Sequence, residues 1–280
     1  MTASGKTRLA GVLGWPVSHS KSPRLHGYWL RHHGLDGVYV PLPTPPERLK
    51  EALRGLVAMG FAGANFTVPH KEAVMPLLNE ISPTAKRIGA VNTIVIAPDG
   101  RTCGDNTDAF GFIENLKSAV PGLAITGRDA VVLGAGGAAR AVCVALADAG
   151  AGCVTVINRT RERAETLAAA LGGHITVADW AERERALSGA ALLINTTSLG
   201  MTGQPALDIA LDALPKTAVV NDLVYAPLET RLLAEAKARG NAAVDGLGML
   251  LFQAQAGFEA WFGVKPEVTP ELRAFVLAPP

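Results

Sequence analysis

Cysteine is scarce in this sequence, and its placement excludes the common metal-binding patterns. The three cysteines, Cys103, Cys143 and Cys153, form no Cys-x-x-Cys pair, so a zinc site of the usual spacing is not expected. An odd, sparse count is also typical of a protein kept in a reducing compartment. We therefore expect a chain without a metal site.

Long apolar runs and blocks of like charge are also missing. No run of about 20 apolar residues is present, so no membrane span is expected, and residues 1–8 lack the apolar core of a signal peptide. The 26 basic and 25 acidic residues leave a formal net charge of +1 without a basic block, which provides no electrostatic footprint for nucleic acid or a membrane surface. These absences indicate a cytoplasmic protein that binds neither.

Apolar residues are abundant and fall in short segments along the chain. Of the 280 residues, 49% are apolar and 18% are charged, which is typical of a globular protein, and the length suits two domains or one large one. Strand-like and helix-like segments alternate, which predicts an α/β fold. We expect an N-terminal substrate domain at 1–108 with a mixed, mainly parallel sheet, and a Rossmann-like domain at 109–245. Residues 246–280 are expected to complete the first domain.

Turn signals and hydrophobic periodicity place the expected elements. Ser22 at an N-cap, Pro23 and the stop signal Gly34 predict a helix at 23–33. Other helices of the first domain are expected at 46–59 and 69–79, and strands at 9–13, 38–42, 63–68 and 91–97, the last in a hairpin. The second domain is expected to have a connecting helix at 109–120 and strands at 130–133, 154–157, 175–177, 192–195 and 219–223. An apolar helix at 249–262 is expected to return to the first domain.

A glycine-rich turn between an apolar strand and an alanine-rich helix carries the clearest chemistry. It contains Gly134, Ala135, Gly136, Gly137 and Ala138, within a Gly-x-Gly-x-x-Ala pattern. The first glycine of such a pattern makes a tight turn, the second lets the backbone approach a pyrophosphate, and the helix N-terminus faces the anion. The turn predicts a dinucleotide site, and a purely structural glycine turn is the alternative interpretation.

The end of the second strand of that domain indicates which dinucleotide is bound. NAD enzymes usually place an acidic residue there, whereas this chain has Asn158, Arg159 and Thr160, followed by Arg163. A guanidinium bonds a 2′-phosphate with its planar fork, and a threonine hydroxyl can add a donor. These residues favour NADP. Solvated helix charges are the alternative, and we adopt that interpretation for Arg161.

Three serines follow the first strand of the chain. Helix capping explains Ser22, whereas Ser18 and Ser20 are left as short hydroxyl donors near a helix start, where a substrate carboxylate can bind. Serine-rich loops are common, so this pattern is weak by itself.

A lysine and an aspartate are the candidates for acid–base chemistry. Lys71 falls in the first turn of the helix expected at 69–79, where the helix dipole should lower the pKa of its amine and suit it to proton transfer near neutrality. A surface lysine paired with Glu72 is an equal alternative. Asp108 lies at the expected domain junction and could hold the Lys71 ammonium, although from spacing alone capping of the connecting helix is the favoured interpretation.

Eight motifs, in order along nearly the whole chain, resemble those of the shikimate dehydrogenase family. They are Gly-x-Pro-Val-Ser-His-Ser-Lys-Ser-Pro at 14–23, Asn-Phe-Thr-Val-Pro-His-Lys at 65–71, Gly-Ala-Val-Asn-Thr at 89–93, Gly-Asp-Asn-Thr-Asp at 104–108, Gly-Ala-Gly-Gly-Ala at 134–138, Asn-Arg-Thr at 158–160, Asn-Thr-Thr-Ser-Leu-Gly at 195–200 and Asp-Gly-Leu-Gly-Met-Leu at 245–250.

The resemblance implies the reversible, NADPH-dependent reduction of 3-dehydroshikimate to shikimate in aromatic amino-acid (chorismate) biosynthesis. It implies that Lys71 is the catalytic acid and base and that Asp108 is its partner. The substrate residues that it implies are Ser18, Ser20 and Tyr225 at the carboxylate, and Thr67, Asn92, Asp108 and Gln253 at the ring hydroxyls. The NADP contacts that it implies are Gly134 to Ala138 and Asn158 to Arg163, with Leu223, Gly246 and Met249 near the nicotinamide.

Other functions stay open from the sequence. The nearest is a dual quinate/shikimate dehydrogenase that uses NAD or NADP, against which Arg159 argues. A folate-type dehydrogenase/cyclohydrolase shares a two-domain layout, but a paired-serine loop does not suit its substrate. An NADP-sensing binding module should lack the pair Lys71 and Asp108. The expected partner is a small-molecule substrate, and the chain is expected to be a monomer or a homodimer.

Overall fold

The computed structural model describes residues 4–278, and the chain divides into two compact units. The first contains the chain up to Thr107 and again from Leu250, and the second spans Asp108–Met249. The predicted α/β fold is confirmed in both units. The units change over at 107/108 and 249/250, where the sequence predicted 108/109 and 245/246. The second change falls inside one helix, α9 (Leu247–Phe262), whose first turn packs in the second unit.

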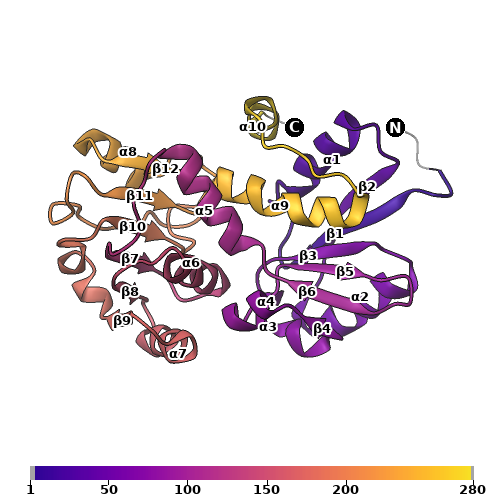
Figure 1. Cartoon of the computed structure of the whole chain (residues 1–280), viewed down its shortest axis with the longest axis horizontal. Coiled ribbons are helices and arrows are strands. Elements are labelled where there is room, and N and C mark those ends of the chain that lie inside the picture. Colours follow the sequence, from indigo (N-terminus) through magenta and orange to yellow (C-terminus); the bar gives the residue numbers. More distant parts are fainter. Residues whose placement is uncertain (1–3, 279–280) are drawn as a thin grey trace. The chain divides into compact units, whose positions relative to one another are not determined.

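The first unit is built on a mixed six-stranded sheet (Figure 1). Its strands, in spatial order, are β2 (Gly37–Pro43), β1 (Arg8–Gly14), β3 (Gly63–Phe66), β5 (Thr93–Ile96), β6 (Thr102–Asp105) and β4 (Glu80–Ile81). The first three strands are parallel, and β5 runs antiparallel to both β3 and β6. The predicted hairpin is therefore confirmed as β5–β6. The two-residue strand β4 was not predicted, because it is too short to show a period.

The helices of the first unit differ from the prediction where proline interrupts them. They are α1 (Ser22–His32), α2 (Leu49–Ala58), α3 (His70–Ala73), α4 (Pro83–Ile88), the part of α9 from Leu250 and α10 (Pro270–Leu277). The helix predicted at 69–79 is wrong in length: α3 has four residues, and a short 3₁₀ turn, Met75–Leu77, follows it. Pro76 explains the break, because it has no N–H to donate and its ring clashes with the preceding turn.

The second unit has a parallel six-stranded sheet. Its strands, in spatial order, are β12 (Ala242–Val244), β11 (Val219–Asp222), β10 (Leu192–Asn195), β7 (Ala130–Leu133), β8 (Val154–Ile157) and β9 (Ile175–Ala178). The chain therefore starts at the centre, moves to one edge and returns to build the other half. This is the dinucleotide-binding order, and ligands bind where the order reverses, between β7 and β10.

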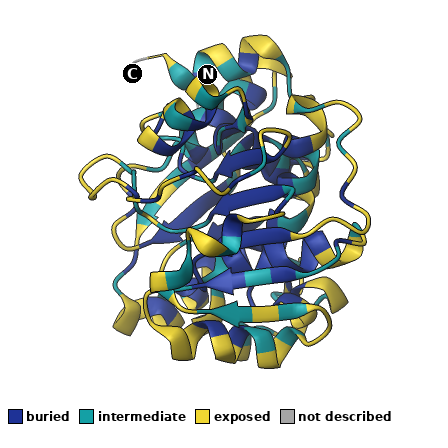
Figure 2. Cartoon of the chain, turned by 90° about the vertical axis from the view of Figure 1, so that its left-hand side faces the viewer, coloured by how far each residue is buried: buried dark blue, intermediate teal, exposed yellow. Residues whose placement is uncertain are grey.

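Apolar side chains cover both faces of this second sheet. Alternate strand residues pack on α5 (Asp108–Ala119), α6 (Gly137–Asp148) and α7 (Arg161–Leu171) on one face, and on α8 (Arg231–Arg239) on the other. Figure 2 shows the central strands of this sheet as buried, with exposed residues on the surrounding helices and loops. Strands buried on both faces read as continuous apolar runs, which is why these strands were predicted closely.

Within residues 4–278, no helix is both long and apolar enough to cross a membrane. In the same range, no group of three or more His, Cys, Asp or Glu side chains could hold a metal ion.

Candidate active site

Backbone hydrogen bonds bring three motif segments of the first unit side by side. Thr67 N donates to Leu13 O at 2.9 Å, which places the end of β3 beside the end of β1. Val91 N donates to Lys71 O at 2.8 Å, which ties α3 to the segment that leads into β5. The serine segment after β1, the Lys71 segment and the Asn92 segment therefore adjoin one another, although up to about 70 residues separate them in the sequence.

Lys71 is half-buried on the short helix α3. The neighbouring His70 is fully buried, and its Nε2 lies 2.8 Å from Thr44 O, so Nε2 carries the proton because a carbonyl oxygen only accepts. This contact fixes the start of α3 against the loop after β2. The sequence predicted that Lys71 lies in the first turn of a long helix, whose dipole would act on its amine. A helix of four residues has only a small dipole, so this effect is not expected in the structure.

The structure corrects the role given to Ser22. The helix α1 begins at Ser22, its N-cap position is Lys21, and no side chain caps it, so the capping explanation of Ser22 is wrong. Ser22 is instead buried, and its N–H donates to Ser20 Oγ at 3.3 Å. Ser18 is exposed on the turn closed by Ser20 N and Val17 O. Ser20 and Ser22 thus lie together at the N-terminus of α1, where the helix dipole favours an anion.

Buried amides form a second polar group in the first unit. Asn92 Nδ2 donates to Gln253 Oε1 at 3.2 Å and to Thr107 Oγ1 at 3.0 Å, and Gln253 Nε2 donates to Leu250 O. Asn92, Thr107 and Gln253 are each less than 9% exposed. Two predicted substrate residues that lie 161 positions apart are therefore in direct contact. The second hydrogen of Gln253 Nε2 can be offered to a ligand hydroxyl.

The glycine-rich turn of the second unit has the geometry that a pyrophosphate needs. Gly134 has a φ of 110°, and a Cβ there would lie 2.4 Å from Thr196 Oγ1, so only glycine fits. Gly136 is the N-cap of α6, faces open space and leaves the helix without a side-chain cap. Ala139 is fully buried against the sheet. Uncapped N–H groups facing open space at the sheet's reversal point suit a phosphate group.

The arginines near the end of β8 fall into two classes. Arg161 pairs with Glu165 at 2.8 Å and with Asp179 at 2.7 Å, and these contacts raise its pKa, so the surface interpretation adopted for Arg161 is supported. Arg159 and Arg163 are exposed, and within residues 4–278 neither forms an ion pair. Their guanidinium groups are available to a 2′-phosphate.

Leu223 and Gly246, both predicted near the nicotinamide, are in contact within the second unit. Gly246 N donates to Val224 O at 3.2 Å, and a Cβ on Gly246 would lie 2.0 Å from Leu223 O, so a side chain there would displace the loop. Met249 is buried in the apolar cluster of the same unit. Tyr225 is half-buried, and burial raises the pKa of its phenol.

Asp222, which sequence reasoning did not select, organises these loops. Its Oδ1 accepts hydrogen bonds from Asn195 Nδ2 at 2.9 Å and Val224 N at 3.0 Å, and its Oδ2 accepts one from Thr230 Oγ1 at 2.7 Å. The carboxyl is inaccessible to solvent, and this burial raises its pKa. The three hydrogen-bond donors act in the opposite direction, but burial has the larger effect. It joins the loop after β10 to the loop after β11. A single Asp after an apolar strand offers no sequence signal for such a role.

The predicted residues are distributed over both units. Lys71, Ser18, Ser20, Thr67, Asn92 and Gln253 belong to the first unit, and Asp108, Tyr225 and every predicted NADP residue belong to the second. Asp108 is the first residue of α5 and is buried. Thr67 is half-buried, between the end of β3 and α3.

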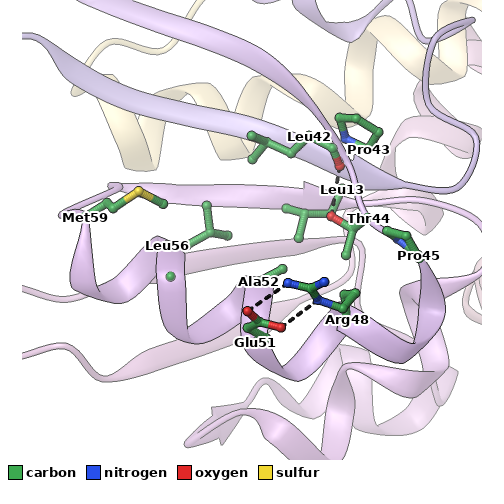
Figure 3. Close-up of a pocket in the computed structure, with 11 residues that line it drawn as sticks. Leu13, Leu42, Pro43, Thr44, Pro45, Arg48, Glu51, Ala52, Leu56 and Met59 are labelled. Carbon is green, nitrogen blue, oxygen red and sulfur yellow. Dashed lines mark hydrogen bonds and ion pairs between the residues drawn. The ribbon is translucent and has the colours of Figure 1, made fainter.

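An open pocket of about 470 Å³ lies elsewhere on the first unit (Figure 3). Leucine, proline and methionine side chains from the ends of β1 and β2, the loop after β2, and α2 with the residue that follows it line most of the pocket. Its charged groups, Arg48 and Glu51, form an exposed ion pair with each other at 2.6 Å. None of the predicted site residues lines this pocket. Its apolar lining does not match a small polar acid, so we do not assign the active site to it.

Comparison with known proteins identifies relatives over the full length. The family described as "Shikimate dehydrogenase substrate binding domain" matches residues 12–94, and that described as "Shikimate / quinate 5-dehydrogenase" matches residues 116–202. A shikimate dehydrogenase (NADP(+)) of Paramagnetospirillum magneticum is 64% identical over 275 residues, which cover 98% of this chain and 100% of that protein.

Solved structures agree with these matches. The crystal structure of shikimate dehydrogenase from Aquifex aeolicus has a TM-score of 0.90 and 38% identity, and the match covers 99% of this chain and 100% of that one. Quinate dehydrogenase from Corynebacterium glutamicum, in complex with NAD, has a TM-score of 0.89 and 33% identity, covering 97% of this chain and 99% of that one.

Proposed function

This chain belongs to the shikimate dehydrogenase family, and we propose that it catalyses the reversible reduction of 3-dehydroshikimate to shikimate with NADPH. The observation that carries the proposal is the arrangement in the first unit. A lysine, a helix N-terminus with two serines and a pair of buried amides lie on adjoining segments. This set matches a substrate that has a ketone, a carboxylate and ring hydroxyls.

The first unit binds the substrate in this proposal. Ser20 and Ser22 bind the carboxylate at the N-terminus of α1, with Ser18 on the preceding turn and Tyr225 of the second unit as further candidates. The hydroxyls of the ring are bound by Thr67, Asn92, Asp108 and Gln253. A rigid, buried amide pair supports such binding, because its orientation is fixed before the substrate arrives.

In this proposal Lys71 transfers the proton and Asp108 assists it. Bound NADPH supplies a hydride to the carbonyl carbon, and negative charge develops on the oxygen. The Lys71 ammonium stabilises that charge and donates a proton to the oxygen, then recovers a proton from solvent. Asp108 pairs with the ammonium and orients it.

The second unit holds the cofactor. The N-terminus of α6, with Gly134, Ala135, Gly136, Gly137 and Ala138, receives the pyrophosphate. Asn158, Arg159, Thr160 and Arg163 bind the adenosine end and its 2′-phosphate. The contact between Leu223 and Gly246, with Met249 nearby in sequence, forms the nicotinamide side of the site.

Steady-state kinetics of Lys71→Ala tests the proposal. With shikimate and NADP+, kcat should fall by roughly 10²–10⁴-fold, because a general acid–base group is removed. The Kd for NADP+ and the melting temperature should stay at wild-type values. Lys50→Ala, which removes an exposed lysine on α2, is the matched control and should keep full activity. Near-normal turnover by Lys71→Ala would refute the proton-transfer role.

Substrate choice is measured in the same assay. We expect kcat/KM to be highest for shikimate with NADP+. A comparable value for quinate, or for NAD+ as cofactor, would identify a dual quinate/shikimate dehydrogenase instead, the activity suggested by the quinate dehydrogenase neighbour.

A further inference from the structure

A buried tyrosine starts a chain of hydrogen bonds that leads to the buried amides of the first unit. Tyr39 lies on the edge strand β2 and is 6% exposed. Its ring stacks on His26 of α1, with centroids 4.0 Å apart and planes 12° apart, and Trp29, Phe258 and Trp261 complete the aromatic cluster. The packing fixes the ring and therefore the position of its hydroxyl group.

The hydroxyl group of Tyr39 has a defined donor direction. Tyr39 Oη donates to Asn65 Oδ1 at 2.6 Å. The Asn65 amide cannot be reversed, because its Nδ2 donates to Asn92 O at 3.1 Å and to Thr93 Oγ1 at 2.9 Å. The single phenolic hydrogen is thus used on Asn65.

The hydrogen bonds continue from Asn65 to the substrate-binding amides. Thr93 Oγ1 donates to Asn92 Oδ1 at 2.9 Å, and Asn92 Nδ2 donates to Gln253 Oε1. Every hydrogen bond from Tyr39 to Gln253 points the same way, and the residues along the chain are buried. Chains of aligned hydrogen bonds strengthen one another at low local dielectric, so the orientation of one member constrains the next.

We propose that Tyr39 is a positioning residue for substrate recognition, which orients the Asn92 and Gln253 amides. This inference rests on the proposed function, in which those amides bind the ring hydroxyls of the substrate. Tyr39 itself touches neither substrate nor cofactor. Its ring belongs to the core, whereas its hydroxyl group serves recognition. Removal of the hydroxyl leaves Asn65 Oδ1 without its donor in a buried place, and the amide then turns away from Thr93 and Asn92.

Tyr39→Phe separates the two roles, because it keeps the stacked ring and removes only the hydroxyl. Tyr28→Phe is the matched control: Tyr28 lies on α1 of the same unit, stacks on His32 and packs at a tilt against Phe275, and within residues 4–278 its hydroxyl group makes no hydrogen bond. Thr93→Val is a second test variant, because it breaks the chain at its middle and leaves Tyr39 in place.

The first measurement is the side-chain amide spectrum of the ¹⁵N-labelled full-length protein without ligands. Tyr39→Phe and Thr93→Val should each shift the amide resonances of Asn92 and Gln253, and Tyr28→Phe should leave them unchanged. Unshifted Asn92 and Gln253 resonances in a folded Tyr39→Phe protein would overturn the inference. This measurement needs no substrate, so it decides the inference even if the wild type fails to turn over shikimate, an outcome that would refute the proposed function alone.

The second measurement is steady-state kinetics with shikimate and NADP+. Tyr39→Phe should raise the KM for shikimate by about 5- to 30-fold, the loss expected for one or two hydrogen bonds, with kcat less affected and the Kd for NADP+ unchanged. Thr93→Val should have a similar effect, and Tyr39→Phe should add little to it, because both act through Asn92. A KM for shikimate equal to that of the wild type would show that the hydroxyl is only structural. A loss of NADP+ affinity as large as the rise in this KM would show the same. If Tyr39→Phe does not fold, Thr93→Val with an unchanged KM gives the same refutation.

Discussion

At the scale of single residues, the serine segment shows how one helix boundary changes a functional assignment. The sequence predicted a helix that starts at Pro23, which would make Ser22 its cap. The helix instead starts at Ser22, and that residue is buried beside Ser20. We predict that Ser22→Ala raises the KM for shikimate by about 10- to 100-fold, as expected for a lost hydrogen bond to a charged group. Ser20→Ala should behave similarly.

Ser18→Ala is the comparison that ranks the three serines. Ser18 is exposed on the turn before α1, so its loss should have the smaller effect on KM. Kinetics of the three single variants, each with a melting curve, gives the ranking. A larger KM for Ser18→Ala than for Ser22→Ala would restore the original prediction that Ser18 and Ser20 form the carboxylate site.

Residues in local motifs could be predicted, whereas residues defined by distant contacts could not. Gly134 and Lys71 stand in short patterns whose chemistry depends on neighbours in sequence. Tyr39 and Asn65 are 26 positions apart, and Asn92 meets Gln253 across 161 positions, so no local pattern records either hydrogen bond. The resemblance to a family supplied Asn92 and Gln253, but nothing supplied Tyr39.

At the scale of elements, we expect the start of α7 to decide which dinucleotide is favoured. Arg159 precedes the helix and Arg163 lies in its first turn, and both are exposed. We predict that Arg159→Ser lowers the affinity for NADP+ by about 10- to 100-fold and leaves the affinity for NAD+ unchanged, because only NADP+ carries the 2′-phosphate. Titration of cofactor into the purified variant measures both.

Arg161→Ser provides the control on the same helix. It removes the same charge from an arginine that is already paired with Glu165 and Asp179. Its effect on NADP+ affinity should be small, since it tests general electrostatic attraction and not a specific contact. Equal losses for Arg159→Ser and Arg161→Ser, or an equal loss of NAD+ affinity in Arg159→Ser, would contradict the phosphate contact.

Whole elements were predicted well where periodicity was strong and poorly where proline or short length decided the outcome. The strand β7 and the helix α6 follow the glycine pattern closely, because turn chemistry and periodicity agree there. The helix α3 ends at Ala73, shortly before Pro76, and the prediction did not take this helix-breaking proline into account. The short helix α4 was missed because six residues give less than two turns of periodicity.

At the scale of the whole molecule, the first unit is completed by the end of the chain. Trp261 Nε1 on α9 donates to Ile94 O of β5 at 2.9 Å, and Trp29 Nε1 on α1 donates to Glu267 O at 3.0 Å. Lys21 Nζ, beside the serines, donates to Val276 O near the end of α10. The C-terminal segment therefore supports the serine segment, and the stability of this unit depends on contacts between segments far apart in the sequence.

The aromatic cluster of the first unit also makes the stability of the molecule depend on pH. His26 lies at its centre, is inaccessible to solvent, and within residues 4–278 neither of its ring nitrogens has a hydrogen-bond partner. Burial lowers its pKa from 6.5 to about 3. The unfolded chain binds a proton near pH 6.5 while the folded chain does not until about pH 3, so stability is lost as the pH falls through this window.

We predict that the free energy of unfolding falls by about 1.6 kcal/mol between pH 6.5 and pH 5 through His26 alone, with the slope approaching about 1.36 kcal/mol for each pH unit below the unfolded pKa. Denaturant unfolding followed by tryptophan fluorescence measures this, since Trp29 and Trp261 border the histidine.

His26→Phe keeps an aromatic ring in the cluster and should remove this part of the pH dependence. The free energy of unfolding of the variant should therefore rise relative to that of the wild type as the solution becomes more acidic. His32→Phe, which alters an exposed histidine on the same helix, should follow the wild-type profile. Parallel profiles for His26→Phe and the wild type would mean that His26 becomes protonated in the folded state, and that the cluster opens to water in this range.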